Sequence, residues 1–326
     1  MLDKTLKKRF CKDENLSINI MDEPYFTERL ELVGKTKTYH NYTKMIENRF
    51  NNDGQAYLEY YNKIKDSAID YIKNLDCFKA LNTCVMPEIK NFSITKSDIY
   101  RDCNVGHRFI SLDIQHANFS VLTAFALQNN IPTWSDKFPY SYYDFISQFT
   151  DVDHIIDSKY IRQVIFGNCN PKRQITYATY LMSLLLSSLL ETQTISTDSI
   201  ASLRTDEIII HADNCGDWTK RTIQDNLRLD ILHQCPIKYE EFTLGKINGT
   251  KAYVKKIENT LDPQIKPKCV SPDEMPIVMR ALRNEEITEH DLVILHEGKL
   301  AILLEKPETF VTYEPINGDA NGQTED

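Results

Sequence analysis

Three segments in the middle of the chain, each with charged residues beside apolar ones, constrain the fold most strongly. The first is a short apolar run that stops at Asp113, and the third leads from Asp206 into three consecutive isoleucines, 208–210. Short apolar runs rich in β-branched residues are typical of buried strands. Between them, Lys159 and Arg162 stand at helical spacing. Because roughly ninety positions separate Asp113 from Asp206, the two carboxylates can meet only if their strands are neighbours in one sheet.

The rest of the chain changes character along its length, and the changes predict an α+β fold. Apolar residues between Tyr57 and Ile72 recur at three- and four-residue spacing, which indicates amphipathic helices near the N-terminus. We expect a central antiparallel sheet with helices packed on one face. The expected regions are an N-terminal helical region (1–95), a central core (96–235), a β-rich C-terminal region (236–313) and a disordered acidic tail (314–326).

Turn and capping signals place further elements in these regions. Asn248-Gly249, between two alternating segments, predicts a β-hairpin, and Glu297-Gly298 separates another pair of strands. Ser158 and Asp157 are candidate caps for a helix over 159–166. Other helices are predicted over 118–128, 142–149, 174–190 and 275–283.

Composition limits the kind of partner that this protein has. A net charge of −9 argues against a generally basic coat for nucleic acid, so any such site is expected to be a local basic groove. No apolar run reaches the roughly 18 residues that a membrane helix needs, and the first residues lack the apolar core of a signal peptide. The eight cysteines form no Cys-x-x-Cys pair. We therefore expect an intracellular, cytoplasmic protein with no membrane segment and no structural metal.

Two acidic residues at strand ends suit the chemistry of nucleotidyl transfer by two metal ions. Carboxylates hold a pair of divalent ions, one of which activates an attacking hydroxyl while the other neutralises the leaving group. Asp113 and Asp206 are the candidate ligands for Mg²⁺ or Mn²⁺. Asp198 is a competing candidate, although its Ser and Thr neighbours are more typical of a turn. Glu207 is a third candidate catalytic residue, and it either tunes the metal site or points to the opposite face of the strand.

Basic residues between the two acidic segments are candidates for binding a nucleoside triphosphate. Lys159 and Arg162 share one helix face, and Lys172 and Arg173 follow the next turn. Arginine binds phosphate through paired hydrogen bonds and lysine binds it as a point charge. Phe166 is a candidate to stack on a base or ribose.

Each of these residues also has a purely structural interpretation. An aspartate after a strand commonly forms a turn or caps a helix, and Asp206-Glu207 is compatible with an exposed strand start. Lys159 and Arg162 are compatible with a solvated helix face. The order of the three segments, more than any one residue, favours a functional interpretation.

The three segments also resemble the sequence motifs of family A DNA polymerases, the phage and bacterial repair type. Residues 111–122 resemble motif A, with Asp113 at the Asp position and Asn118 where the family has Glu. Residues 162–167 are similar to motif B, with Arg162 in place of its Lys. Residues 205–208 resemble motif C, with Thr205 in place of His.

The resemblance implies a palm-like sheet with a fingers helix, encoded by a phage or virus. It also implies Mg²⁺ or Mn²⁺ as cofactor, a nucleic acid and a nucleoside triphosphate as partners, and addition of nucleotides to a nucleic-acid 3′ end. The motif departures leave a second hypothesis open, a catalytically degenerate relative that serves as an accessory or binding protein in a replication or transcription complex.

Two weaker signals complete the sequence analysis. Lys246-Ile-Asn-Gly249 approximates the Lys-x-Asp-Gly pattern of covalent nucleotidyl transfer by a ligase. His211 and Asp213 follow the third segment closely, and they are the His–Asp pair that lies nearest to the proposed site.

Overall fold

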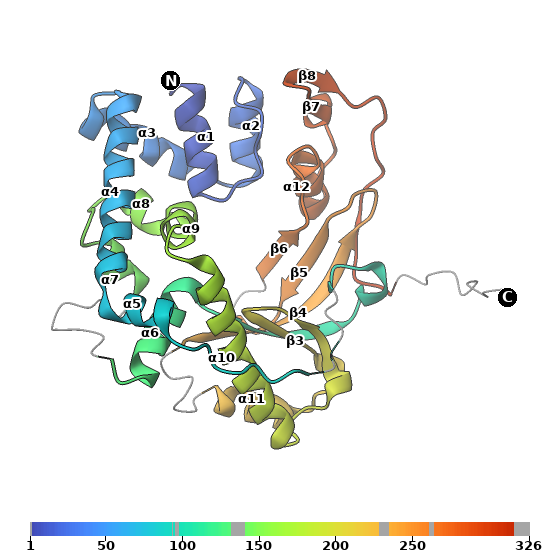
Figure 1. Cartoon of the computed structure of the whole chain (residues 1–326). Coiled ribbons are helices and arrows are strands. Elements are labelled where there is room, and N and C mark those ends of the chain that lie inside the picture. Colours follow the sequence, from blue (N-terminus) through green and yellow to red (C-terminus); the bar gives the residue numbers. More distant parts are fainter. Residues whose placement is uncertain are drawn as a thin grey trace. The chain divides into compact units, whose positions relative to one another are not determined.

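A computed structural model describes residues 2–92, 94, 98–131, 141–227, 235–260 and 264–315. It confirms the predicted α+β class, with helices and an antiparallel sheet in one chain (Figure 1). The chain forms two compact units, each assembled from three segments. The first unit contains residues 1–84, 125–173 and 271–307, and the second contains 85–124, 174–270 and 308–326.

The first unit is mainly helical, as the periodicity of the N-terminal region predicts. Its helices are α1 (Lys4–Asp13), α2 (Tyr25–Leu32), α3 (Thr36–Phe50), α4 (Gly54–Asn74), α5 (Asp76–Thr83), α7 (Tyr142–Ile146), α8 (Asp153–Asp157), α9 (Lys159–Gly167) and α12 (Met275–Arg283). Helix α9 packs against α1 and α4. The buried Asp13 carboxylate at the end of α1 accepts hydrogen bonds from Tyr61 and from Ser158, the residue before α9. Segments far apart in sequence therefore share one core.

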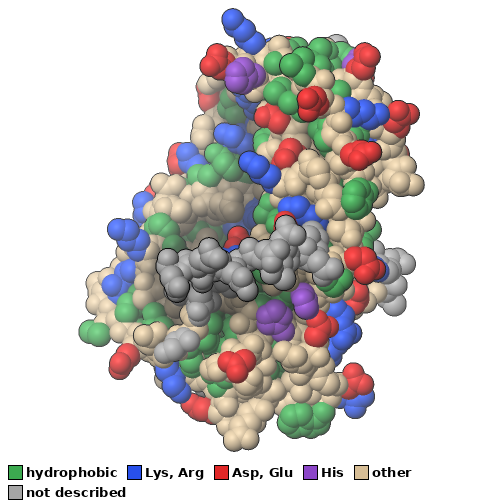
Figure 2. Space-filling model, turned by 90° about the vertical axis from the view of Figure 1, so that its right-hand side faces the viewer, with side chains coloured by type: hydrophobic (Ala, Val, Ile, Leu, Met, Phe, Trp, Pro, Cys, Tyr) green, Lys and Arg blue, Asp and Glu red, His purple; other side chains and the backbone are tan. Residues whose placement is uncertain are grey.

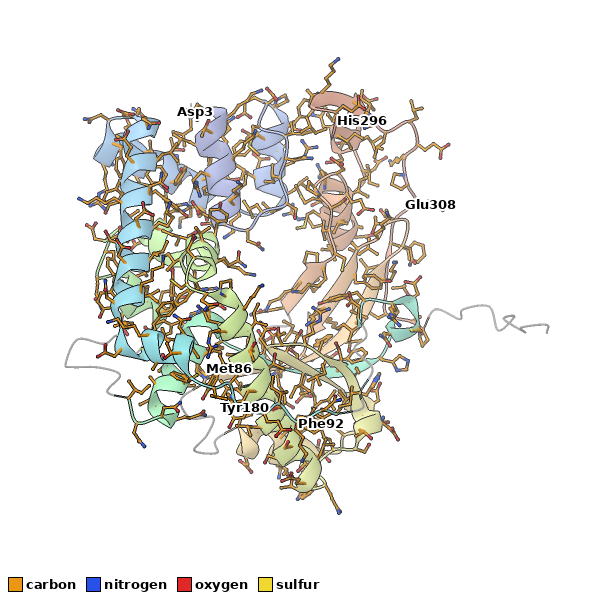
Figure 3. The ribbon with its side chains drawn as sticks, in the orientation of Figure 1. Asp3, Met86, Phe92, Tyr180, His296 and Glu308 are labelled. Atoms are coloured by element: carbon orange, nitrogen blue, oxygen red, sulfur yellow. The ribbon has the colours of Figure 1, made fainter. Side chains whose placement is uncertain are left out.

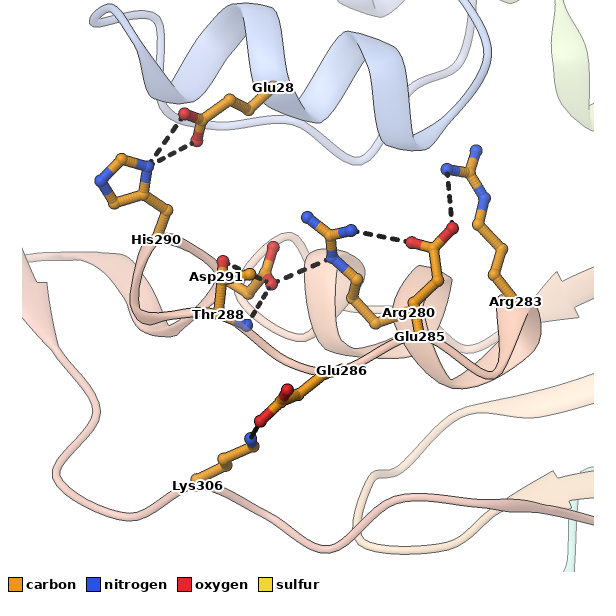
Figure 4. A network of polar contacts seen from close by, with 9 residues as sticks. All are labelled: Glu28, Arg280, Arg283, Glu285, Glu286, Thr288, His290, Asp291 and Lys306. Carbon is orange, nitrogen blue, oxygen red and sulfur yellow. Dashed lines mark hydrogen bonds and ion pairs between the residues drawn. The ribbon is translucent and has the colours of Figure 1, made fainter.

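The last segment of the first unit is tied to α2 by polar contacts (Figure 4). The imidazole of His290 lies 2.9 Å from the Glu28 carboxylate, and Arg29 donates a hydrogen bond to the carbonyl of Val293. The buried Asp291 accepts hydrogen bonds from Thr288 and Arg280. The hairpin of β7 (Val293–His296) and β8 (Lys299–Ile302) follows, and it turns at Glu297-Gly298 as predicted.

The second unit is built on the antiparallel sheet. Its strands are β1 (Arg108–Ile114), β2 (Ile200–Leu203), β3 (Glu207–His211), β4 (Ile237–Ile247), β5 (Tyr253–Ile257), β6 (Gln264–Lys268) and β9 (Val311–Thr312). They run in the order β2-β3-β1-β4-β5-β6, and β9 also pairs with β4. The chain between β1 and β2 begins with α6 (Ala117–Gln128), passes through α7 to α9 of the first unit and ends with α10 (Pro171–Glu191), and α11 (Asp217–Asn226) precedes β4. The connectivity of β1 to β4 is that of a split βαβ fold.

The sheet is covered on both faces. On one face Phe109, Ile209 and Phe242 form a core with Ile99 and Val105 of the preceding loop. On the other, Glu241 makes an ion pair with Lys220 of α11. The buried Ile110 of β1 and the buried Ile208 and Ile210 of β3 point to that second face because successive strand side chains alternate.

The segment that enters the second unit runs alongside α10. Figure 3 labels Met86 and Phe92 on this segment and Tyr180 on the helix. Lys90 makes an ion pair with Glu191 at the end of α10, with 2.9 Å between Nζ and Oε1. The segment is thus anchored to the helix before the chain reaches the sheet.

Several predicted boundaries need adjustment. Strand β1 continues to Ile114, so Asp113 lies within the strand and not after it. The helix expected over 142–149 ends at Ile146, and α10 begins at Pro171, three residues before its predicted start. The Asn248-Gly249 turn joins β4 to β5 as predicted. Residues 316–326 of the predicted disordered tail lie outside the described residues.

A helix needs about 20 mostly apolar residues to cross a bilayer. No helix within the described ranges combines that length with that apolar character. Acidic and basic side chains are interspersed on the face that Figure 2 shows.

Candidate functional site

Strand pairing brings the predicted acidic residues together in the second unit. Asp113 on β1 stands directly opposite Glu207 on β3, and Asp206 lies in the turn that joins β2 to β3. The Ile114 amide donates a hydrogen bond of 3.0 Å to the Asp206 carbonyl, which fixes that turn against β1. Directly opposite residues have Cβ atoms about 4.5–5.5 Å apart. The expectation that the two acidic segments occupy neighbouring strands is confirmed.

Neighbouring strands add polar residues to the same face of the sheet. The hydroxyl of Ser111 donates a hydrogen bond of 2.7 Å to Glu207 Oε1, and Lys255 Nζ on β5 lies 3.6 Å from that same oxygen. Glu240 stands opposite Ser111, and it makes ion pairs with Lys238 and Lys266. The name carboxylate cluster is used below for six residues: Asp113, Asp206, Glu207, Ser111, Glu240 and Lys255.

The acidic members of the cluster differ in whether a lysine neutralises their charge. Glu207 and Glu240 each have a lysine partner. Asp113 and Asp206 make no ion pair with any described residue, and the only side-chain hydrogen bond at either carboxylate comes from the Thr205 hydroxyl to Asp206. Burial, followed by the charges of Glu207 and Asp206, raises the pKa of Asp113 to about 6. A partly buried carboxylate without a cation is a candidate for binding one.

The oxygen donors of Asp113 and Asp206 suit a hard divalent ion such as Mg²⁺. However, no group of three or more His, Cys, Asp or Glu side chains in the described part of the chain is arranged to hold a metal ion. A metal held by these two aspartates would take its remaining ligands from water or substrate, as Mg²⁺ commonly does.

The predicted phosphate-binding residues belong to the first unit. Ser158 caps α9 as predicted, since its hydroxyl accepts a hydrogen bond of 3.1 Å from the Ile161 amide. Lys159 is exposed, and the half-buried Arg162 lies over the ring of Tyr142. Lys172 is exposed at the start of α10. Lys159, Arg162 and Lys172 therefore keep side chains that solvent or a ligand can reach.

Two of the predicted contact residues have structural roles instead. The Phe166 side chain is 1% exposed and lies 6.3 Å from the ring of Phe145, so it offers no face to a base. Arg173 donates hydrogen bonds to the carbonyls of Leu81 and Cys84 at the C-terminus of α5. A guanidinium there satisfies carbonyls that have no partner in the helix.

The remaining sequence signals also have structural explanations. Lys246 Nζ lies 3.2 Å from Asp102 and over the Tyr253 ring, which leaves it paired rather than available as a nucleophile. Asp213 accepts hydrogen bonds from the backbone and side chain of Arg108, and burial lowers the pKa of His211.

Sequence reasoning missed Lys255 and Ser111. The alternation of Tyr253, Lys255 and Ile257 along a predicted strand places all three on one face. This alternation predicts which face of the strand Lys255 occupies, but it does not predict that β5 lies two strands away from β1.

Comparison with known proteins adds no relative: no family model, no curated protein and no solved structure matches this chain.

Proposed function

We propose that this protein is a metal-dependent nucleotidyltransferase of the polymerase-like class, which adds nucleotides to a nucleic-acid 3′ end. The observation that carries the proposal is the pairing of β1 with β3, which sets Asp113 beside Glu207 and Asp206. Both aspartates lack a basic partner among the described residues. The resemblance of the surrounding segments to polymerase motifs A and C supports the same assignment.

In this proposal Asp113 and Asp206 would hold Mg²⁺ or Mn²⁺. The bound metal would activate the attacking 3′ hydroxyl and offset the charge on the leaving pyrophosphate. Ser111 and Lys255 hold Glu207 in place, so that its charge stays beside Asp113. Nucleic acid and a nucleoside triphosphate are the proposed partners. Lys159, Arg162 and Lys172 belong to the first unit, and their contact with the triphosphate stays a prediction from the sequence. We place the protein in the cytoplasm, that of the host if a phage or virus encodes it.

A second candidate function is favoured by one specific observation. The buried ammonium of Lys255 lies among the carboxylates, where an active metal site would need room for a cation. A protein in which lysine has taken that position would serve as a binding or accessory component of a replication or transcription complex. The two functions differ in whether nucleotide is incorporated.

The test is incorporation of nucleotides onto labelled DNA and RNA primers, with and without template, in Mg²⁺ and then in Mn²⁺. The native protein is compared with Asp113→Asn and Asp206→Asn. The matched control is Asp198→Asn, which changes the competing metal candidate, an exposed aspartate outside the cluster. Extension that both cluster variants lose and the control retains would establish the activity. Absence of extension under every condition would favour the accessory function.

A further inference from the structure

Lys255 is the one cation of the carboxylate cluster as defined above, and it is deeply buried. Lys255 is 5% exposed, and its ammonium lies 3.6 Å from Glu207 Oε1 and 4.2 Å from the centroid of the Phe242 ring. Lysine is almost never buried to this extent unless its charge is paired. The position of this charge is therefore set by the sheet, because the Phe242 ring belongs to the neighbouring strand β4 and the Glu207 carboxylate to β3, on the far side of β1.

Within the cluster, the Lys255 charge acts mainly on Glu207 and the two aspartates. Glu240 on β4 is already neutralised by Lys238 and Lys266, through contacts of 2.5 and 3.1 Å. Lys266 also stands opposite Lys255 in the β5–β6 register. Of the acidic members, Glu207 carries the direct contact, and Asp113 feels the lysine charge without contacting it.

We propose that the Lys255 ammonium is a built-in cation of the cluster and takes a position that a divalent ion would otherwise hold. Glu207 is then committed to Lys255 and Ser111, and only Asp113 and Asp206 remain for a metal. The site consequently holds one divalent ion at most. The inference rests on the proposed function only in naming these two aspartates as ligands.

The test is binding of Mn²⁺ to the full chain, measured by electron paramagnetic resonance without nucleotide or nucleic acid. Lys255→Met removes the charge and keeps an unbranched apolar chain over Phe242. Loss of the Lys255 charge, which acts on Asp113 electrostatically, is expected to tighten Mn²⁺ binding by about tenfold or more. Lys266→Met removes an equal charge from the next strand and is expected to change binding much less, because Lys266 pairs with Glu240.

Two further variants make the result decisive. Lys255→Gln repeats the test with a polar side chain if the methionine variant does not fold. Adding Asp113→Asn to Lys255→Met must abolish the tighter binding. Unchanged Mn²⁺ affinity in the Lys255 variants, no binding in any variant, or two tightly bound ions in the native protein would each overturn the proposal. Because no nucleotide is used, tighter Mn²⁺ binding without any primer extension would leave this inference standing and remove the enzymatic function.

Discussion

The surroundings of Asp113 disfavour the ionised form of its carboxylate. Its carboxylate is more than half buried, it stands opposite Glu207, and it has no basic partner among the described residues. The pKa of about 6 lies well above its ordinary value, so the folded protein binds a proton to Asp113 more readily than the unfolded chain does. A residue placed at a cost to stability is a common mark of a functional site.

Asp113→Asn is therefore expected to stabilise the metal-free protein at neutral pH. The unfolded carboxyl titrates near its ordinary value and the folded one near 6, so the penalty is complete above pH 6 and absent below about pH 4. We expect a gain of about 1 kcal/mol at pH 7.5, after discounting for partial exposure. Urea unfolding at pH 7.5 and pH 4 measures it. An equal gain at both pH values would exclude this electrostatic cause.

At the scale of elements, Arg173 joins the start of α10 to α5, although the sequence analysis predicted that it binds the triphosphate. Arg173 satisfies carbonyls at the end of α5. Arg173→Ala is expected to lower the free energy of unfolding by about 1–3 kcal/mol, because charged donors to buried acceptors are worth that much. The matched control is Lys159→Ala, which removes an exposed cation of α9.

Thermal and urea unfolding of these two variants separate the roles. We expect Arg173→Ala to unfold more easily with little change in the concentration of nucleotide needed for incorporation. A variant of native stability that required far more nucleotide would instead return Arg173 to the phosphate site.

At the scale of the whole molecule, the chain visits each unit more than once. Helices α1 and α4 of the segment 1–84 pack against α9 of the segment 125–173. Asp13 likewise accepts hydrogen bonds from Tyr61 of the first segment and from Ser158 of the second. A fragment of residues 1–84 would expose the surfaces that α8 and α9 cover. We expect it to show no cooperative thermal transition by circular dichroism, in contrast to the full chain. A sharp transition in the fragment would show that the first segment folds alone.

Local patterns predicted elements far better than they predicted this arrangement. The helix over 159–166, its Ser158 cap and the hairpin at Asn248-Gly249 depend on adjacent residues, so the sequence carries them directly. The roles of Phe166, Arg173 and Lys255 depend on segments distant in the chain. Nothing within a few residues of Arg173 indicates that the carbonyls of α5 lie beside it. Asp113 and Glu207 were found because each stands beside a short apolar run, which is also a local signal.

The most direct measurement for the central claim is incorporation of a single labelled nucleotide onto a primer in Mn²⁺, comparing Asp206→Asn with Asp198→Asn. The claim is that Asp113 and Asp206 form one metal-dependent site on neighbouring strands. We expect native and Asp198→Asn protein to extend the primer, and Asp206→Asn to lose at least about a hundredfold in rate, as when transition-state charge stabilisation is removed. Equal extension by both variants would contradict the claim.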